Sequence, residues 1–179
     1  MADLAPPHRR TLDGDVRLDR AKGIGARPAV RGLRRFETAV ELPLAVEEVF
    51  EFFSDAGNLE RITPPELQFR ILTPLPIEMG RGTLIDYRLR LQGVPFRWRT
   101  EISEWAPPHA FTDRQLRGPY HTWVHHHTFE SIADGTLMTD QVDYRLPLWP
   151  FGEWAHPLVG RSVHRIFAFR SETIRRILL

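Results

Sequence analysis

The strongest constraint on the fold lies in residues 83–146, where segments of alternating apolar and polar residues are separated by turn signals. Such alternation is typical of β-strands with one buried and one exposed face. A two-residue turn at Gln92-Gly93 places Tyr87 opposite Trp98 on an apolar face and leaves arginines on the other face. The region therefore predicts antiparallel strands with a dry face and a wet face.

A second hairpin signal, Asp134-Gly135, separates two further strands. A two-residue turn there places Phe129 opposite Asp140 on the inner face and His126 beside Asp143 on the solvent face. The strands expected in this region cover residues 83–92, 94–105, 110–117, 120–133 and 136–146.

The inner face of residues 110–117 is less well defined by the pattern. The register that places Phe111, Asp113 and Gln115 inside is preferred. A strict two-residue turn at Gly118-Pro119 does not give this register, so it requires a bulge or a longer turn.

Helical spacing occurs on both sides of this strand-rich region. A strand at 35–42 ends at Pro43, and an apolar stripe over Val46–Phe53 then predicts a short helix. Residues 55–62 predict a second short helix, and residues 69–72 a short strand. The last 25 or so residues form one long apolar stripe, interrupted by Arg170. Only this helix is long enough to cover the dry face of the sheet.

The charge of the chain divides it into two parts. The 179 residues carry a net charge of +1, but residues 1–35 hold nine bases and four acids, so the remainder is −4. The first 33 residues lack aromatics and any sustained apolar period, which predicts a disordered basic arm (1–33) before one folded domain (34–179). The arm is open to interpretation as a nucleic-acid tether, but its dispersed bases favour a cloning remnant, an upstream start codon or a solvated tail.

Several function classes are excluded or disfavoured. The chain has no cysteine, which excludes disulfides, thiolate zinc sites and cysteine nucleophiles. No apolar run approaches the roughly 20 residues of a membrane span, and no signal-peptide core follows Met1. We therefore expect a cytoplasmic chain with no integral membrane association, no nucleic-acid partner and no cofactor. The pattern leaves the oligomeric state open.

The order of elements and a series of local motifs resemble the helix-grip fold of the START/Bet v1 (SRPBCC) superfamily. The likeness extends over roughly residues 35–179 and is greatest to its bacterial ligand-binding, polyketide cyclase/dehydrase-like members. The motifs that carry it are Asn58-Leu59, Ile62–Pro65, Gly93–Trp98, Trp105–Pro108, Gly118–Tyr120, Trp123–His125, Asp140–Tyr144 and Ile166–Arg170. The resemblance implies an α+β fold, with a curved antiparallel sheet of about seven strands wrapped around the C-terminal helix.

The resemblance also implies a cavity between sheet and helix that holds a hydrophobic or amphipathic small molecule such as a lipid, polyketide or isoprenoid. We expect binding, sequestration or transport without catalysis. The alternatives are a cyclase or dehydratase, and a protein-interaction module with a filled interior. The candidate ligand-binding residues are the inner-facing Tyr87, Trp98, Thr100, Phe111, Asp113, Trp123, His125, His127, Asp140, Val142, Tyr144, Val163, Phe167 and Arg170.

Five of these candidates have particular chemical interest. His125 and His127 lie two apart on a strand and share a face, so with Asp140 they are able to ligate a metal. Ordinary polar lining of the cavity is the favoured interpretation, and we expect no metal. An enzyme would use these residues or Asp113 as acid and base. Arg170 either pairs with Asp140 or Asp113, extends to water, or binds an anionic group of the ligand.

Overall fold

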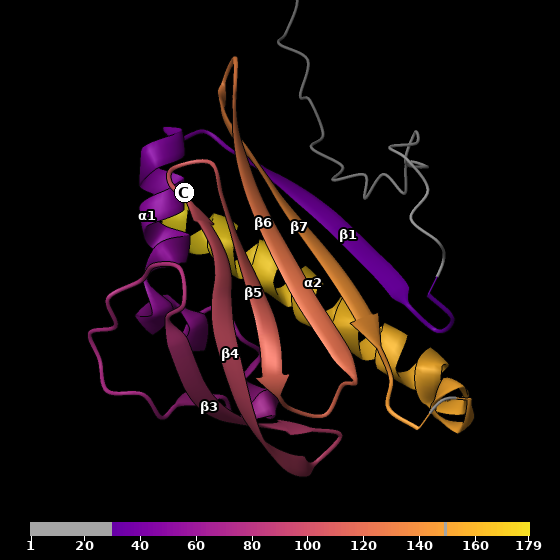
Figure 1. Ribbon diagram of the computed structural model, residues 1–179. Coiled ribbons are helices and arrows are strands. Elements are labelled where there is room, and N and C mark those ends of the chain that lie inside the picture. The colour runs from indigo at the N-terminus through magenta and orange to yellow at the C-terminus, as the bar shows by residue number, and fades with distance from the viewer. Residues whose placement is uncertain (1–29, 149) are drawn as a thin grey trace, which may run out of the picture.

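A computed structural model describes residues 30–148 and 150–179. Its seven strands form one antiparallel sheet in the order β1-β7-β6-β5-β4-β3-β2. The sheet curves around the long helix α2 (Figure 1). The strands are β1 (Arg34–Leu42), β2 (Arg70–Ile71), β3 (Leu84–Leu91), β4 (Val94–Ala106), β5 (Ala110–Arg117), β6 (Thr122–Ile132) and β7 (Gly135–Arg145).

The helical elements are the two α-helices α1 (Val46–Ser54) and α2 (His156–Leu178) and three short 3-10 helices. The latter are η1 (Ala56–Glu60), η2 (Pro65–Leu67) and η3 (Phe151–Ala155). This architecture confirms the predicted helix-grip fold, although the second short helix is a 3-10 helix. The expected arm lies mostly outside the described residues, and Val30–Leu33 forms a turn closed by one backbone hydrogen bond.

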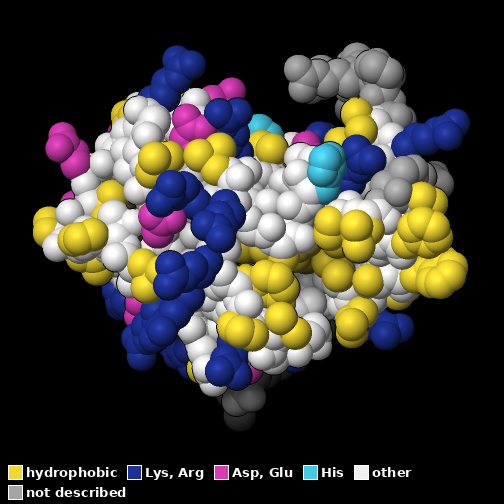
Figure 2. Space-filling view, turned by 60° about the horizontal axis from the view of Figure 1, so that its bottom comes forward, with side chains coloured by type: hydrophobic (Ala, Val, Ile, Leu, Met, Phe, Trp, Pro, Cys, Tyr) yellow, Lys and Arg dark blue, Asp and Glu magenta, His cyan; other side chains and the backbone are white. Residues whose placement is uncertain are grey.

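The apolar stripe of α1 forms the main core together with the end of α2. Val49 and Phe50 on α1 are buried against Phe129 on the sheet and Ile174 on α2. None of the described helices is both long and apolar enough to cross a membrane. Figure 2 shows hydrophobic side chains gathered on one part of the surface and arginine or lysine side chains on another.

The hairpin between β3 and β4 has the predicted register, with Tyr87 opposite Trp98. The predicted register of the β6–β7 hairpin is wrong by two residues, because the turn is Ala133-Asp134 and Gly135 already pairs with Ile132. Gly135 has φ +138°, and a Cβ there would approach the carbonyl oxygen of Leu42. This glycine therefore allows a close backbone approach instead of forming the turn. An even shift leaves every side chain on its predicted face.

The connection between β5 and β6 is longer than two residues, as the preferred register required. Asp113 pairs with His125 and Phe111 with His127 on the inner face. Irregularities in the β4–β5 register help to place this strand. Gln115, which we expected inside, lies opposite the buried Thr100 and is itself partly buried, and it binds the backbone of Tyr120 through the oxygen and nitrogen of its side-chain amide.

Candidate functional site

A cavity lies between the inner face of the sheet, α1 with η1, and α2. Its volume, taken as the space that the centre of a water molecule can reach, is about 140 Å³, and its wall is mostly apolar. Side chains therefore do not fill the space between the sheet and α2. Among the candidates, the residues that line it are Tyr87, Trp98, Thr100, Phe111, Asp113, Trp123, His125, His127, Val163, Phe167 and Arg170.

Three candidates lie behind this wall. Val142 and Tyr144 are buried in a second core cluster with Val163 and Phe167. Asp140 is buried on β7, on the far side of the two histidines from the cavity. Five further residues line the cavity but were not among the predicted ligand-binding residues: Asn58, Met79, Ile85, Leu89 and Tyr120. The alternation along β3 was the signal for Ile85 and Leu89, which lie on that strand.

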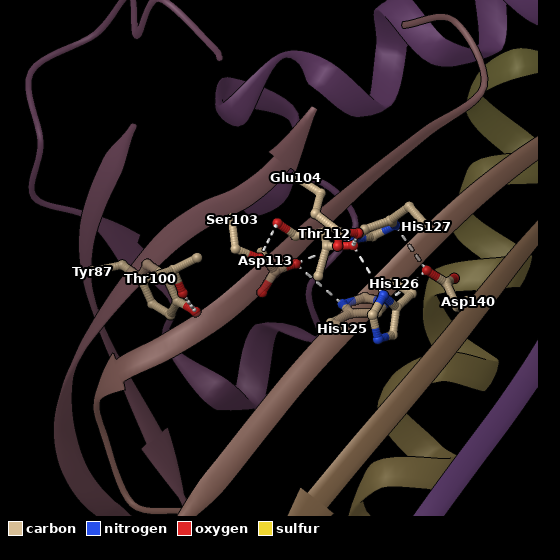
Figure 3. Close-up of polar contacts among 10 residues, drawn as sticks. All are labelled: Tyr87, Thr100, Ser103, Glu104, Thr112, Asp113, His125, His126, His127 and Asp140. Carbon is tan, nitrogen blue, oxygen red and sulfur yellow. Dashed lines mark hydrogen bonds and ion pairs between the residues drawn. The ribbon is translucent and has the colours of Figure 1, made fainter. Parts of the chain in front are cut away.

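Two aspartates and two histidines meet at one end of the cavity (Figure 3). Strand register brings them together: β5 places Asp113 opposite His125, and β7 places Asp140 opposite His127. His125 and His127 are successive inner residues of β6, with ring centroids 3.8 Å apart. We call these four residues the Asp–His cluster. Its two histidines are only 5% exposed, so the polar contacts within the cluster replace water.

The two aspartates contact the histidines at different distances. Oδ1 of Asp140 accepts a hydrogen bond of 2.7 Å from Nε2 of His125 and lies 3.0 Å from Nδ1 of His127. Oδ2 of Asp113 lies 3.4 Å from Nδ1 of His125 and 3.3 Å from Nε2 of His127. His125 is therefore held tightly by Asp140, whereas His127 forms its hydrogen bond with Asp113 and its buried Nδ1 has no hydrogen-bond partner among the described residues.

The cluster shifts the pKa values of its members. Burial opposes ionisation of both aspartates, yet hydrogen bonds and nearby positive charge hold the pKa values of Asp140 and Asp113 below the ordinary carboxyl range. Burial and the neighbouring ring lower the pKa of His125. Burial acts the same way on His127, but its contacts with Asp113 and Asp140 outweigh this and raise its pKa. Two ionised carboxylates therefore face a histidine pair in which His127 is the more basic ring.

Arg170 lines the cavity but forms no ion pair with Asp113 or Asp140 in the part of the chain that the structure describes. The histidines occupy both carboxylates, so the pairing hypothesis for Arg170 is wrong. Its guanidinium lies 5.0 Å from the ring centroid of Phe167, and its buried Nε has no hydrogen-bond partner. The remaining interpretations are contact with water or with a ligand.

Another prediction concerned His126 on the opposite face of β6. The residue opposite it is Gln141 instead of Asp143, because of the two-residue register shift. Nδ1 of His126 lies 2.9 Å from Oγ1 of Thr112, which itself donates to Glu104. Thr112 and His126 are paired residues on the outer face of β5 and β6, and Figure 3 draws them with the Asp–His cluster.

Comparison with known proteins identifies the family. A family model described as polyketide cyclase / dehydrase and lipid transport matches residues 34–176. Among solved structures, the Zhui aromatase/cyclase from Streptomyces sp. R1128 is 20% identical with a TM-score of 0.59, and the match covers 81% of this chain and 96% of that one.

Two other solved structures show the same fold. Protein Ms6760 from Mycobacterium smegmatis is 17% identical with a TM-score of 0.59, over 80% of this chain and 90% of that one. The major latex-like protein 151 from Panax ginseng is 14% identical with a TM-score of 0.58, over 82% and 98%. These identities support the fold alone. The family model covers most of the described chain, and we conclude that the chain belongs to the polyketide cyclase/dehydrase and lipid transport family.

Proposed function

We propose that this chain binds a small, largely apolar molecule with one polar end in the cavity beneath α2. The observation that carries the proposal is the mostly apolar wall interrupted by charged and polar groups of the Asp–His cluster and Arg170. Such a lining buries an apolar body and orients a polar group. The family description, which includes lipid transport, supports a ligand of this class.

The two parts of the wall contribute differently to binding. Apolar burial supplies affinity at about 25 cal/mol per Å² before the entropic cost of association. The polar end of the cavity supplies orientation, because a group that reaches it finds an unpartnered Nε of Arg170 and the loosely held carboxylate of Asp113. Tyr87 and Thr100 add hydroxyl groups, which lie 3.1 Å from each other.

Native mass spectrometry of the protein purified from its own host tests this proposal. A co-purifying small molecule of mostly apolar character is expected. Binding to a panel of fatty acids, isoprenoids and aromatic polyketides is then measured by the fluorescence of the cavity tryptophans, Trp98 and Trp123. The absence of a co-purifying molecule together with no binding anywhere in the panel contradicts the proposal.

A pair of variants locates the ligand. Val163→Phe adds a ring to a residue of the cavity wall, whereas Ile174→Phe adds one to the same helix within the closed core. Both changes overpack buried positions and destabilise by about 1–3 kcal/mol. Only Val163→Phe is expected to abolish binding. Equal retention of binding by both folded variants places the ligand elsewhere.

A second candidate function is acid–base catalysis of the cyclase or dehydratase type. The specific observation is the contact between Asp113 and His127. Both side chains line the cavity, so either can exchange a proton with a substrate bound there. One structural relative is named an aromatase/cyclase, which supports the reaction class.

Dehydration of a β-hydroxy ketone tests the catalytic candidate. If the chain is an enzyme, His127→Gln lowers the rate by about 10²–10⁴-fold and leaves binding of the substrate analogue largely intact. His126→Gln, on the opposite face of the strand, leaves the rate unchanged. No turnover across a series of such ketones contradicts catalysis of this type and leaves the binding proposal in place.

A further inference from the structure

We propose that Asp113, His125 and His127 form a binding site for a divalent transition metal of the zinc type, with its open position facing the cavity. The three side chains each offer one ligand atom, and these atoms lie within 4.8 Å of one another. The site would bind its metal whether or not an organic ligand is present, so this inference goes beyond the proposed function.

The first argument concerns where the protons of the rings lie. Nε2 of His125 and Nδ1 of His127 both face the same oxygen of Asp140. A carboxylate only accepts hydrogen bonds, so it favours a proton on each of these two nitrogens. For His125 this leaves Nδ1 as a lone pair facing Oδ2 of Asp113. Nε2 of His127 forms only a long contact of 3.3 Å with the same oxygen, and its buried Nδ1 has no hydrogen-bond partner in the part of the chain that is described, so a metal bound at Nε2 would place the proton of this ring on Nδ1, beside Asp140.

Three electron-pair donors then face one another on the cavity side. Two lone pairs and a carboxylate oxygen repel each other unless a cation lies among them. That cation is either a third proton, which would charge one ring, or a metal ion.

The distances favour a metal. Charge-assisted hydrogen bonds between nitrogen and a carboxylate are usually about 2.7–2.9 Å long, and the bond on the Asp140 side has this length. On the cavity side, Oδ2 of Asp113 is 3.4 Å from His125 and 3.3 Å from His127. A tetrahedral zinc site with bonds of about 2.1 Å separates its ligand atoms by about 3.4 Å. Both distances from Asp113 to the histidine nitrogens therefore match the separation of ligand atoms in a zinc site, and the two nitrogens lie within 4.8 Å of each other.

Asp140 completes the arrangement from behind. Histidines that ligate zinc usually donate their second N–H to a carboxylate, which fixes the ring and its tautomer. Asp140 accepts this bond from His125, lies 3.0 Å from Nδ1 of His127 and is itself only 3% exposed. The sequence pattern suggested Asp140 as a ligand, but the structure assigns that place to Asp113. Asp140 becomes the supporting carboxylate.

The choice of metal follows from the donor atoms. Two imidazoles and one carboxylate suit zinc, iron, cobalt or nickel, and they do not suit calcium or magnesium, which prefer oxygen ligands. Three protein ligands leave a fourth tetrahedral position open for water or an oxygen of the ligand, as in catalytic zinc sites. That position lies on the cavity side, because all three ligands line the cavity and Asp140 does not.

Titration of the full, chelator-treated chain with Zn²⁺, followed by calorimetry, tests the site. Wild type and the outer-face control His126→Gln are expected to bind one equivalent with equal affinity. Asp113→Asn keeps the shape but removes the charge, and is expected to bind at least about 10-fold more weakly. Asp140→Asn is expected to lose about 10- to 100-fold. Wild-type protein without one-equivalent binding, or Asp113→Asn with unchanged affinity, overturns the proposal.

A measurement on the wild-type chain removes dependence on variants that fail to fold. In nitrogen NMR of ¹⁵N-histidine-labelled protein, Zn²⁺ is expected to shift Nδ1 of His125 and Nε2 of His127, one nitrogen of each type. The opposite nitrogens keep their protons. Shifts confined to other histidines overturn the assignment. Binding of apolar ligands measured with chelator present shows separately whether the proposed function holds.

Discussion

Oδ1 of Asp140 accepts a hydrogen bond of 2.7 Å from Nε2 of His125, and both side chains are at most 5% exposed. The same oxygen lies 3.0 Å from Nδ1 of His127, so Asp140 contacts both histidines of the Asp–His cluster. A buried acceptor of this kind is costly to change, because its partners have no water to replace it.

Asp140→Asn is therefore expected to lower the free energy of unfolding of the metal-free chain by about 3–5 kcal/mol. The amide keeps the shape but leaves the histidines without their anionic partner. Urea denaturation followed by tryptophan fluorescence measures the change. Asp143→Asn is the matched control on the same strand, because its partner Arg35 is largely exposed and such pairs contribute about 0.2–1 kcal/mol. Equal losses in the two variants contradict the special position of Asp140.

The second prediction concerns the stability of the folded chain at acid pH. Burial opposes ionisation of Asp140, but its bonds to the histidines hold its pKa well below the ordinary value of about 3.9. The folded chain therefore binds this proton more weakly than the unfolded chain does. The resulting stabilisation is fully present above about pH 3.9 and is lost as the pH falls from there toward the folded pKa.

Unfolding free energies of chelator-treated protein measured down the acid range check this. Wild type is expected to lose stability more steeply than Asp140→Asn below the ordinary carboxyl pKa, so that the two curves converge. Parallel curves would show that Asp140 titrates alike in the folded and unfolded chains.

The faces of the strands could be predicted from sequence, because alternation fixes a face without fixing a register. The two-residue error at Gly135 shows this: His125 and His127 remained inside, while the residues opposite them changed. Asp140 was therefore placed inside correctly but opposite the wrong residue. Its contact with the histidines needed the correct register.

The position of Asp113 and the partners of Arg170 depended on features that local patterns do not encode. The loop after β5 and the irregular β4–β5 register determine which residue lies opposite His125. Arg170 looked like a partner for an acid because it interrupts an apolar stripe. The histidines on β6 contact both acids, and these contacts depend on how β5, β6 and β7 pair in the sheet.

The third prediction separates two roles of glycine. Gly135→Ala places a methyl group against the backbone of Leu42 at φ +138°, whereas Gly93→Ala meets nothing within 4 Å at φ +80°. Gly93→Ala is expected to cost about 1–2 kcal/mol from backbone strain alone. Gly135→Ala adds a steric clash that forces β1 away from β7, so its cost is larger. Thermal unfolding of both variants measures this, and equal costs contradict the close approach.

The last prediction concerns Arg170, whose buried Nε has no partner among the described residues and which lines the cavity. If its guanidinium binds an anionic group of the ligand, wild type prefers a fatty acid over the alcohol of equal chain length. Hydrogen bonds to a charged group contribute about 1.5–3 kcal/mol, so Arg170→Met is expected to weaken fatty-acid binding by about 10- to 100-fold. Binding of the alcohol changes little, because the apolar contacts remain. Arg170→Lys keeps the charge without the fork of donors and is expected to fall between the two. Equal weakening for acid and alcohol assigns Arg170 to packing against Phe167 instead.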